Sequence, residues 1–353
     1  MLADGDVFVV DATVHGWSVL PENRAQPYVD HIVKLMYYWA TEQLHPRGDP
    51  AYRLPFESFE RLVEYQPRLL ESVLFGESDI DVALYQGVPL YGLFKDGSSP
   101  IWIAEQIRER LPHRMFIYGD VSPWRPDATR RIEELVDDSG VIGLKFYPLD
   151  LVDGTLHPVR FDDEERMFPL IELARAKGLK VIAIHKAIPL APTTVDQFHV
   201  EDLAPAAKAF PDMTFEIVHG GFAYAREIAA LLERYPNITV NLEGAPCYAL
   251  NFPARFADML APLLASGAPD RIFFSTGAPV MHPQPFINTF WRFEMPRGYP
   301  KLTPEIKRGI LGENFARQHG WDLESLKRDC DRDEYGLRKK TAEPWSVIRG
   351  SRH

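Results

Sequence analysis

The sequence predicts an α/β protein whose eight parallel strands close into a (β/α)8 barrel, the TIM barrel. Eight short runs rich in β-branched and aromatic residues recur along the 353 residues, and helix-like segments separate most of them. No glycine-rich nucleotide-binding fingerprint follows the first run, which weakens the alternative of an open doubly wound sheet. We therefore expect one barrel domain over residues 1–320.

The expected strands are short and apolar, as buried parallel strands are. They cover residues 7–11, 81–85, 115–120, 141–147, 180–185, 214–220, 238–244 and 272–277. The segments between them carry apolar residues at helical spacing. The expected helices cover residues 100–111, 128–138, 164–178, 200–210, 224–235, 254–267 and 303–319.

Two segments exceed what a minimal barrel needs. The connection at about residues 20–75 contains a helix-like stretch and a Pro/Gly-rich stretch, so we expect a lid or a subunit-contact insertion there. Residues 321–353 are highly charged, and from residue 323 onward Trp345 is nearly the only large apolar anchor. We expect this C-terminal arm to lie on the surface or on a neighbouring subunit of a homo- or hetero-oligomer.

Composition and charge argue against several classes of protein. The 39 Lys and Arg residues against 50 Asp and Glu give a formal net charge of −11, which would repel a nucleic-acid backbone. Two cysteines, Cys247 and Cys330, are too few for a disulfide framework and lack the spacing of a structural zinc site. No apolar run is long enough for a membrane span or a secretory signal, so we expect a cytoplasmic protein.

Polar side chains stand at or beyond the ends of the expected strands. Because the carboxyl ends of barrel strands meet at one mouth, these side chains should converge. Imidazole and carboxylate groups are ligands for divalent ions such as zinc, iron or manganese. A lone histidine at a strand end is more often structural, but four of the 11 histidines occupy comparable places. We therefore expect a site for one or two ions with ligands among Asp11, His15, His185, His219, Glu243 and His282.

The chain resembles the amidohydrolase superfamily, in the branch of amidohydrolase-related hydrolases and metal-dependent decarboxylases. The resemblance covers roughly residues 5–320, and its order and spacing are more specific than any single motif. It is carried by VVDATVH on strand one, GLKFYP on strand four, His185, IVHGG on strand six and the closing ILGENFARQ. The resemblance implies a TIM barrel with a metal centre at its mouth.

Two positions depart from that branch. It usually has D-x-H-x-H or E-x-H on strand one and G-[ST]-D-x-P on strand eight, whereas this chain has Thr13 and Gly277 at the two positions. The chain is then either a non-catalytic subunit or an enzyme whose altered metal site uses Glu243 and His282. We favour the altered site, because a decayed site has no reason to keep its histidines. A small subgroup of two-metal thioesterase-like hydrolases and oxygenases resembles this departure more closely.

Lys145 and His199 are further candidate catalytic residues. Four roles are open for Lys145. It is a buried ion-pair partner of Asp120 or Glu243, it forms a carbamate that bridges two metal ions, it acts as an acid or base, or its charge binds a substrate carboxylate. His199 is either a proton donor at the mouth or a residue that stabilises its loop. Three aromatic side chains near strand ends either line a substrate pocket or belong to the core: Trp17, Tyr147 and Tyr248.

The function expected first is that of a metal-dependent hydrolase. A bound ion would lower the pKa of a water molecule and polarise the carbonyl of an ester, thioester, amide or lactone. Asp11 or Glu243 would act as the base. The alternatives are a decarboxylase, a dimetal oxygen-dependent hydroxylase of a small carboxylic acid, and a non-catalytic partner subunit. Each enzyme alternative takes a small molecule that carries a carbonyl or a carboxylate.

Overall fold

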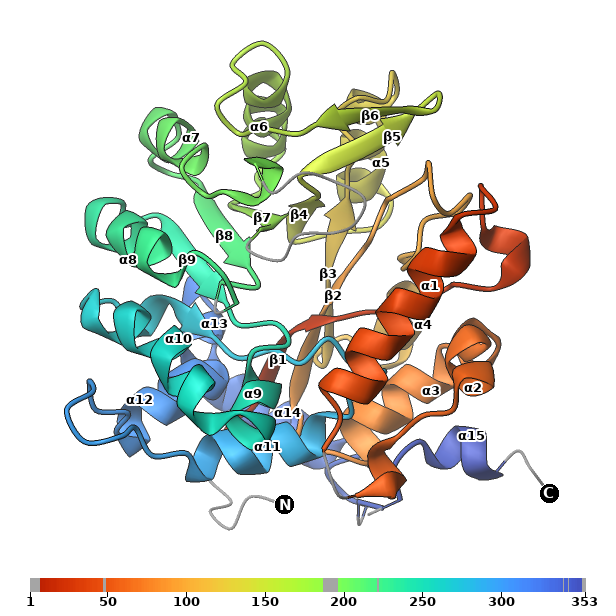
Figure 1. Cartoon of the computed structure of the whole chain (residues 1–353), viewed down its shortest axis with the longest axis vertical. Helices are drawn as coiled ribbons and strands as arrows, with labels where there is room; N and C mark the ends of the chain where they lie inside the picture. Colours follow the sequence, from red (N-terminus) through yellow and green to blue (C-terminus); the bar gives the residue numbers. More distant parts are fainter. Residues whose placement is uncertain are drawn as a thin grey trace.

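The structure confirms the predicted barrel. It is a computed structural model that describes residues 7–46, 49–186, 196–220, 222–338, 340–341 and 343–350. Eight parallel strands follow one another around a central axis with helices outside them (Figure 1). In sheet order the strands are β1 (Val10–Val14), β2 (Val82–Gln86), β3 (Met115–Asp120), β4 (Gly143–Phe146), β7 (Val181–His185), β8 (Thr214–Val218), β9 (Ile238–Asn241) and β10 (Ile272–Phe273).

Backbone hydrogen bonds close the barrel between β1 and the segment that follows β10. The amide of Ala12 donates to the carbonyl of Phe274 at 3.1 Å, and that of His15 donates to Ala278 at 2.8 Å. In the opposite direction, the amide of Gly277 donates to the carbonyl of Thr13 at 3.0 Å. The expected strand ran to residue 277, whereas β10 ends at Phe273. The residues after β10 nevertheless belong to the barrel wall, because these hydrogen bonds join them to β1.

Strand β1 begins three residues later than the sequence predicted. It pairs Val10 with Val82 and Asp11 with Ala83, and the pairing continues to Val14 opposite Tyr85. Asp11 therefore lies inside the strand and not at its end. Its carboxylate therefore does not lie at the carboxyl end of the strand.

The predicted helices surround the strands, with one of them divided. The segment expected as one helix at 303–319 consists of α12 (Pro304–Arg308), a π-helical turn (Gly309–Glu313) and α13 (Asn314–Gln318). The hairpin β5–β6 and helices α9 and α11 were not expected. The remaining elements of the barrel are α4 (Trp102–Arg110), α5 (Ala128–Asp137), β5 (Leu149–Val152), β6 (Thr155–Pro158), α6 (Met167–Ala176), α7 (Leu203–Ala209), α8 (Ala225–Arg234), α9 (Pro246–Asn251), α10 (Pro253–Ala265) and α11 (Pro283–Arg292).

The long connection after β1 is helical and lies beside the barrel opening, where Figure 1 shows α1. Helix α1 (Val29–Tyr37) buries Val29 and Val33, while Leu35 on another side of the helix is exposed. The other elements of this connection are α2 (Phe56–Glu60), α3 (Arg68–Glu71), the 3-10 turns Pro21–Asn23, Pro50–Tyr52 and Leu62–Tyr65, and the π-helical turns Tyr38–Gln43 and Ser72–Gly76.

Two further 3-10 turns lie elsewhere in the barrel: Asp196–Phe198 after β7 and Pro269–Arg271 before β10.

The C-terminal arm contains α14 (Leu323–Arg332) and α15 (Ser346–Gly350) and packs on its own barrel. Trp345 is 1% exposed, and its indole donates to the carbonyl of Pro279 at 2.8 Å. Arg114 donates to both Asp333 and the carbonyl of Cys330. The arm thus has its anchors within the same chain, and oligomer formation stays a prediction. Gly221 of the IVHGG motif and residues 351–353 lie outside the described residues.

No helix in the described ranges is long and apolar enough to span a lipid bilayer.

Candidate active site

Four of the predicted side chains meet at the carboxyl ends of β1, β7, β8 and β9. His15 Nε2 lies 3.0 Å from Glu243 Oε1, and His219 Nε2 lies 3.3 Å from Glu243 Oε2. His185 Nδ1 lies 3.1 Å from His219 Nε2. All four residues are at most 5% exposed. We refer to His15, His185, His219 and Glu243 as the mouth cluster.

Two backbone carbonyls orient the histidines of the mouth cluster. His15 Nδ1 lies 2.9 Å from the carbonyl oxygen of Gln86, and His219 Nδ1 lies 3.1 Å from the carbonyl oxygen of Glu243. A carbonyl oxygen only accepts hydrogen bonds, so each Nδ1 carries the proton. In the neutral ring the lone pair is then on Nε2, which faces the Glu243 carboxylate. Such a backbone contact at the second ring nitrogen is typical of metal-binding histidines.

The electrostatics of the cluster favour an ionised carboxylate. Burial raises the pKa of Glu243, but the nearby His219, His15 and Lys145 outweigh it and hold this pKa well below its usual range. Burial lowers the pKa of His219, so its neutral form is favoured. Acceptor atoms of neutral His219 and ionised Glu243 therefore face each other at close range. A metal ion between them would be attracted by both acceptor atoms.

The donor types of the mouth cluster fit a divalent ion, because three imidazoles and one carboxylate form a common ligand set for zinc, iron or manganese. Among the described residues, no group of three or more His, Cys, Asp and Glu side chains is already arranged around an ion position. The contacts of 3.0–3.3 Å join the side chains to one another in pairs. Binding an ion therefore requires these side chains to adjust.

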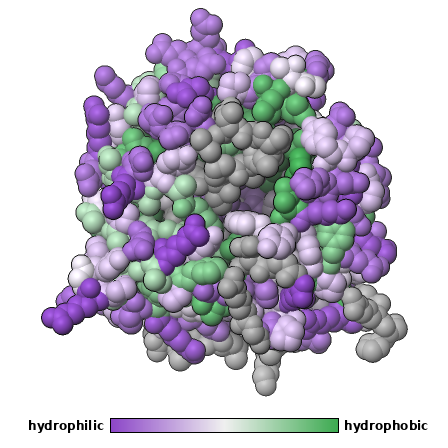
Figure 2. Space-filling view, in the orientation of Figure 1, coloured by the Kyte–Doolittle hydropathy of each residue, from purple (hydrophilic) through white to green (hydrophobic). Residues whose placement is uncertain are grey.

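The mouth cluster forms the floor of a cavity of about 540 Å³. Its described walls are almost entirely apolar or aromatic, and none of the described lining residues is Lys or Arg. The elements around it include α1, the turn that follows α1 and the hairpin β5–β6. Figure 2 shows hydrophobic side chains gathered beside the hollow in this face. Trp17 and Tyr147 line the cavity, whereas Tyr248 packs on Phe222 and Phe252 instead.

The two departures from the resembling family have local structural explanations. A Cβ atom at Gly277, whose φ is +77°, would lie 3.0 Å from Glu243 Oε1. The missing side chain of strand eight thus leaves room for the Glu243 carboxylate. At the other position, the Thr13 hydroxyl accepts a hydrogen bond from Asn241 Nδ2 at 2.9 Å. Gly277 therefore makes room for Glu243, and the Thr13 side chain takes part in a hydrogen bond with Asn241.

Lys145 lies next to the mouth cluster and is completely buried. Its ammonium donates to Gln86 Oε1 and lies 5.7 Å from the centre of the Tyr147 ring. Burial lowers the pKa of Lys145 to about 8, against the opposing charges of Glu243 and Glu216. Gln86 orients His15 through its backbone carbonyl and binds Lys145 through its side chain, but it was not among the predicted site residues. Its position as a polar residue at the end of strand two was the available signal.

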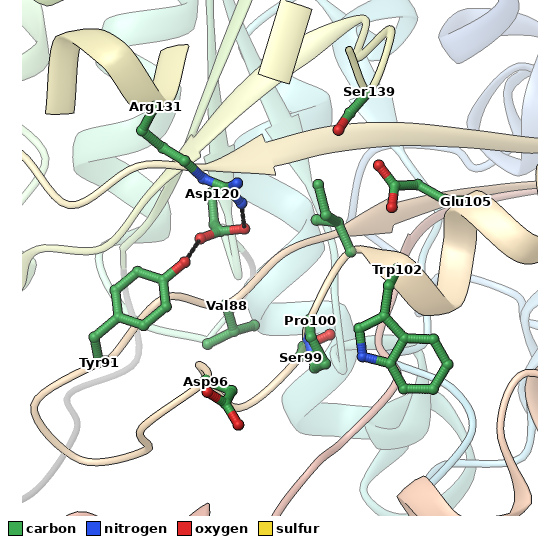
Figure 3. A pocket seen from close by; sticks show the side chains of 11 residues that line it. Val88, Tyr91, Asp96, Ser99, Pro100, Trp102, Glu105, Asp120, Arg131 and Ser139 are labelled. Atoms are coloured by element: carbon green, nitrogen blue, oxygen red, sulfur yellow. Dashed lines mark hydrogen bonds and ion pairs between the residues drawn. The ribbon is translucent and has the colours of Figure 1, made fainter. Parts of the chain in front are cut away.

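Asp120 has partners other than Lys145. Its carboxylate accepts hydrogen bonds from the Tyr91 hydroxyl and from Arg131 at 3.0 Å (Figure 3). These residues border a separate polar cleft of about 230 Å³ beside α4. Of the two ion-pair partners suggested for Lys145, only Glu243 is therefore supported, and it acts through its charge.

Asp11 is placed away from the mouth cluster. Val10 and Ala12 belong to the apolar cluster inside the barrel, so the intervening Asp11 points to the other face of the strand. Its carboxylate accepts hydrogen bonds from the amide and hydroxyl of Thr276. Burial raises the pKa of Asp11 to about 7 in spite of these hydrogen bonds. We do not keep Asp11 among the proposed ligands or bases.

His282 and His199 are also placed elsewhere. His282 Nε2 lies 3.2 Å from Glu77 Oε2, and His282 Nδ1 accepts from the amide of Gln284 at 3.4 Å, where α11 begins. His199 Nδ1 lies 3.7 Å from Glu201 Oε2, and its ring centre lies 4.4 Å from that of Tyr224. Neither is among the described residues that line the cavity. Neither is kept in the proposed site.

Comparison with known proteins identifies the family. Residues 98–318, more than half of the chain, match the family model described as amidohydrolase. The chain belongs to the amidohydrolase family. No curated protein matches the sequence significantly. The match includes three of the four residues of the mouth cluster, all except His15.

Solved structures with low sequence identity have the same fold. An uncharacterised TIM-barrel protein from Bordetella bronchiseptica is 20% identical, with a TM-score of 0.63 over 92% of this chain and 100% of that one. A 2,6-dihydroxybenzoate decarboxylase from Rhizobium is 15% identical, with a TM-score of 0.54 over 89% and 99% of the chains. A dihydroxybenzoic acid decarboxylase from Polaromonas, with bound manganese and 2-nitroresorcinol, is 12% identical, with a TM-score of 0.52 over 94% and 99%.

Proposed function

We propose that this member of the amidohydrolase family is a metal-dependent hydrolase of an ester, thioester, amide or lactone. One observation carries the proposal: His15 and His219, each oriented by a backbone carbonyl, direct Nε2 at the Glu243 carboxylate on the floor of an apolar cavity. The cavity leads a substrate carbonyl to these atoms and limits the access of bulk water to them.

The proposed ligands are His15, His185, His219 and Glu243, for one or two ions. When bound, such an ion would lower the pKa of a water molecule and polarise the substrate carbonyl. Manganese is the first ion to test, because the similar decarboxylase from Polaromonas contains it. Iron and zinc suit the same ligand types.

The side chains around the ligands have separate proposed roles. Glu243 stays ionised, so its carboxylate is available both as a ligand and as an acceptor for the proton of the attacking water. Lys145 supports that ionised state through its positive charge. Tyr147 stacks on His185 with ring centres 4.8 Å apart and so restricts the rotation of this imidazole.

Decarboxylation of a small carboxylic acid is the second candidate. Lys145 near the Tyr147 ring provides a cation and an aromatic face beside the mouth cluster, which would suit an aromatic carboxylate. Two of the structurally similar proteins are decarboxylases of dihydroxybenzoic acids. The absence of Lys and Arg from the described cavity walls favours hydrolysis, because those walls offer a carboxylate no ion-pair partner.

The test measures metal content and reaction type on the same preparations. The full chain is produced with manganese, iron or zinc supplied, and each form is given p-nitrophenyl esters or 2,6-dihydroxybenzoate. We expect ester hydrolysis that requires bound metal and is lost in Glu243→Gln. Release of CO2 without ester hydrolysis would establish the decarboxylase instead, and oxygen consumption would indicate the hydroxylase. Absence of metal from every form would contradict the proposal and support a non-catalytic subunit.

A further inference from the structure

We infer that the cavity holds a bulky, uncharged hydrocarbon group of the substrate, and that α1 and the hairpin β5–β6 select it by size. The inference rests on the proposed hydrolase and adds the substrate class: an ester or thioester of a large apolar acid, with its carbonyl at the mouth cluster. The volume of about 540 Å³ falls in the range of roughly 300–1,000 Å³ that buries most of a drug-sized ligand.

The exposed apolar residues of the chain point to where this group lies. Eight large apolar side chains in the described residues are more than a third exposed, and four of them border this one cavity. The four are Tyr28, Leu35, Tyr38 and Leu156, exposed by 47%, 43%, 54% and 41%. Scattered exposed apolar residues are ordinary, but a group beside a cavity is typical of a binding surface.

The border has two sides that belong to different elements. On one side, α1 buries Val29 and Val33 in the core while Leu35 and Met36 turn to the cavity. On the other side, Leu151 of β5 pairs with Leu156 of β6, and both line the cavity. Cross-strand partners point to the same face of a hairpin. Each side therefore presents apolar surface that its own element does not bury.

A hydrocarbon group between these two sides would cover this surface. The surface is continuous with the cavity that ends at the mouth cluster, so the substrate itself is the occupant we propose. An anionic group would be disfavoured there, because the described lining contains no Lys or Arg and its one acidic side chain is Glu243. Each additional buried methylene should improve binding by about fourfold.

The first experiment compares p-nitrophenyl acetate with p-nitrophenyl octanoate, which has six more methylene groups. We expect kcat/KM to be at least about 30-fold higher for the octanoate. Leu35→Asp and Leu156→Asp should each lower the ratio of the octanoate kcat/KM to the acetate kcat/KM about tenfold. Leu250→Asp is the matched control, because Leu250 is 37% exposed but does not border the cavity. Equal rates for both esters would contradict the inference.

The second experiment is independent of turnover. The neutral probe N-phenyl-1-naphthylamine should bind with a stoichiometry of one molecule per chain, and its fluorescence should increase on binding. Its Kd should be about tenfold higher in Leu35→Asp and Leu156→Asp and unchanged in Leu250→Asp. Such binding without ester hydrolysis would support the apolar site while contradicting the hydrolase. Ester hydrolysis without probe binding, and with no dependence on acyl length, would keep the hydrolase and overturn the inference.

Discussion

The two ends of the barrel each contain a histidine whose pKa is lowered by burial, with opposite surroundings. At the carboxyl end, His219 Nε2 faces His185 and the Glu243 carboxylate. At the other end, His319 follows α13; its Nε2 contacts the Tyr118 hydroxyl at 2.8 Å, and its ring lies against Phe315 and Trp321. Burial lowers the pKa of both histidines. The direction of the pKa shift therefore does not distinguish them, and their neighbours do.

His282 extends the comparison, since it is also a buried histidine beside a glutamate. Its partner Glu77 accepts hydrogen bonds from the amides of Trp345 and Ser346 and from the hydroxyl of Ser72. The Glu77 carboxylate thus accepts hydrogen bonds from both the insertion after β1 and the C-terminal arm. In the mouth cluster, the corresponding contacts of Glu243 are to imidazole nitrogens, which leaves it suited to a cation.

The largest expected effect separates the two ends of the barrel. His219→Ala and Glu243→Gln should each weaken metal binding by about 100-fold or more and abolish turnover, because each removes a proposed ligand group. The measurement is elemental analysis after dialysis, with circular dichroism to confirm folding. His319→Ala is the matched control and should keep its metal. Full metal content in the His219 or Glu243 variant would contradict the proposal that the carboxyl end of the barrel binds the metal through these residues.

The next effect concerns Glu77. Glu77→Ala should lower the free energy of unfolding by about 3–5 kcal/mol, because it leaves buried donors and His282 without their partner. Urea denaturation measures this change. Glu172→Ala serves as the control on an exposed carboxylate and should change stability by less than about 0.5 kcal/mol. Loss of metal from folded Glu77→Ala protein would contradict a purely structural role.

His319 should make stability depend on pH. Burial lowers its pKa from 6.5 to about 4, so between these values the unfolded chain binds the proton more readily than the folded one. Its contribution is full above pH 6.5 and is lost as the pH falls towards 4, by at most about 3 kcal/mol. His319→Gln should remove this part of the dependence in urea denaturation series at several pH values. An unchanged slope would mean that His319 does not titrate in this window.

The smallest effect tests the space at Gly277. Gly277→Ala and Gly178→Ala should each cost about 1 kcal/mol of stability, because both positions have positive φ, +77° and +88°. Only Gly277 lies against Glu243, whereas nothing lies within 4 Å of a Cβ atom at Gly178. Metal affinity should therefore fall about threefold to tenfold in Gly277→Ala alone. Equal metal affinity in both variants would show that Gly277 does not make room for Glu243.

Much of the mouth cluster could be predicted because it follows from strand ends. His185 and His219 come directly at or after apolar strands, and parallel strands of a barrel end at one mouth. Asp11 could not be placed in the same way, because β1 continues to Val14 and leaves Asp11 inside the strand, between Val10 and Ala12 of the interior apolar cluster. Side chains alternate along a strand, so the outcome depends on register, which pairing with β2 decides.

The sequence by itself determined the barrel, because the alternation of short apolar strands with helices is a local pattern that repeats along the chain. It also pointed to His15, His185, His219 and Glu243, but it did not separate them from Asp11 and His282, which lie elsewhere. Only the tertiary structure decided that His282 pairs with Glu77, that Gln86 orients His15, and that α1 and β5–β6 line the cavity. These pairings join residues tens to hundreds of positions apart, so they depend on packing between elements and leave no periodic signal in the sequence.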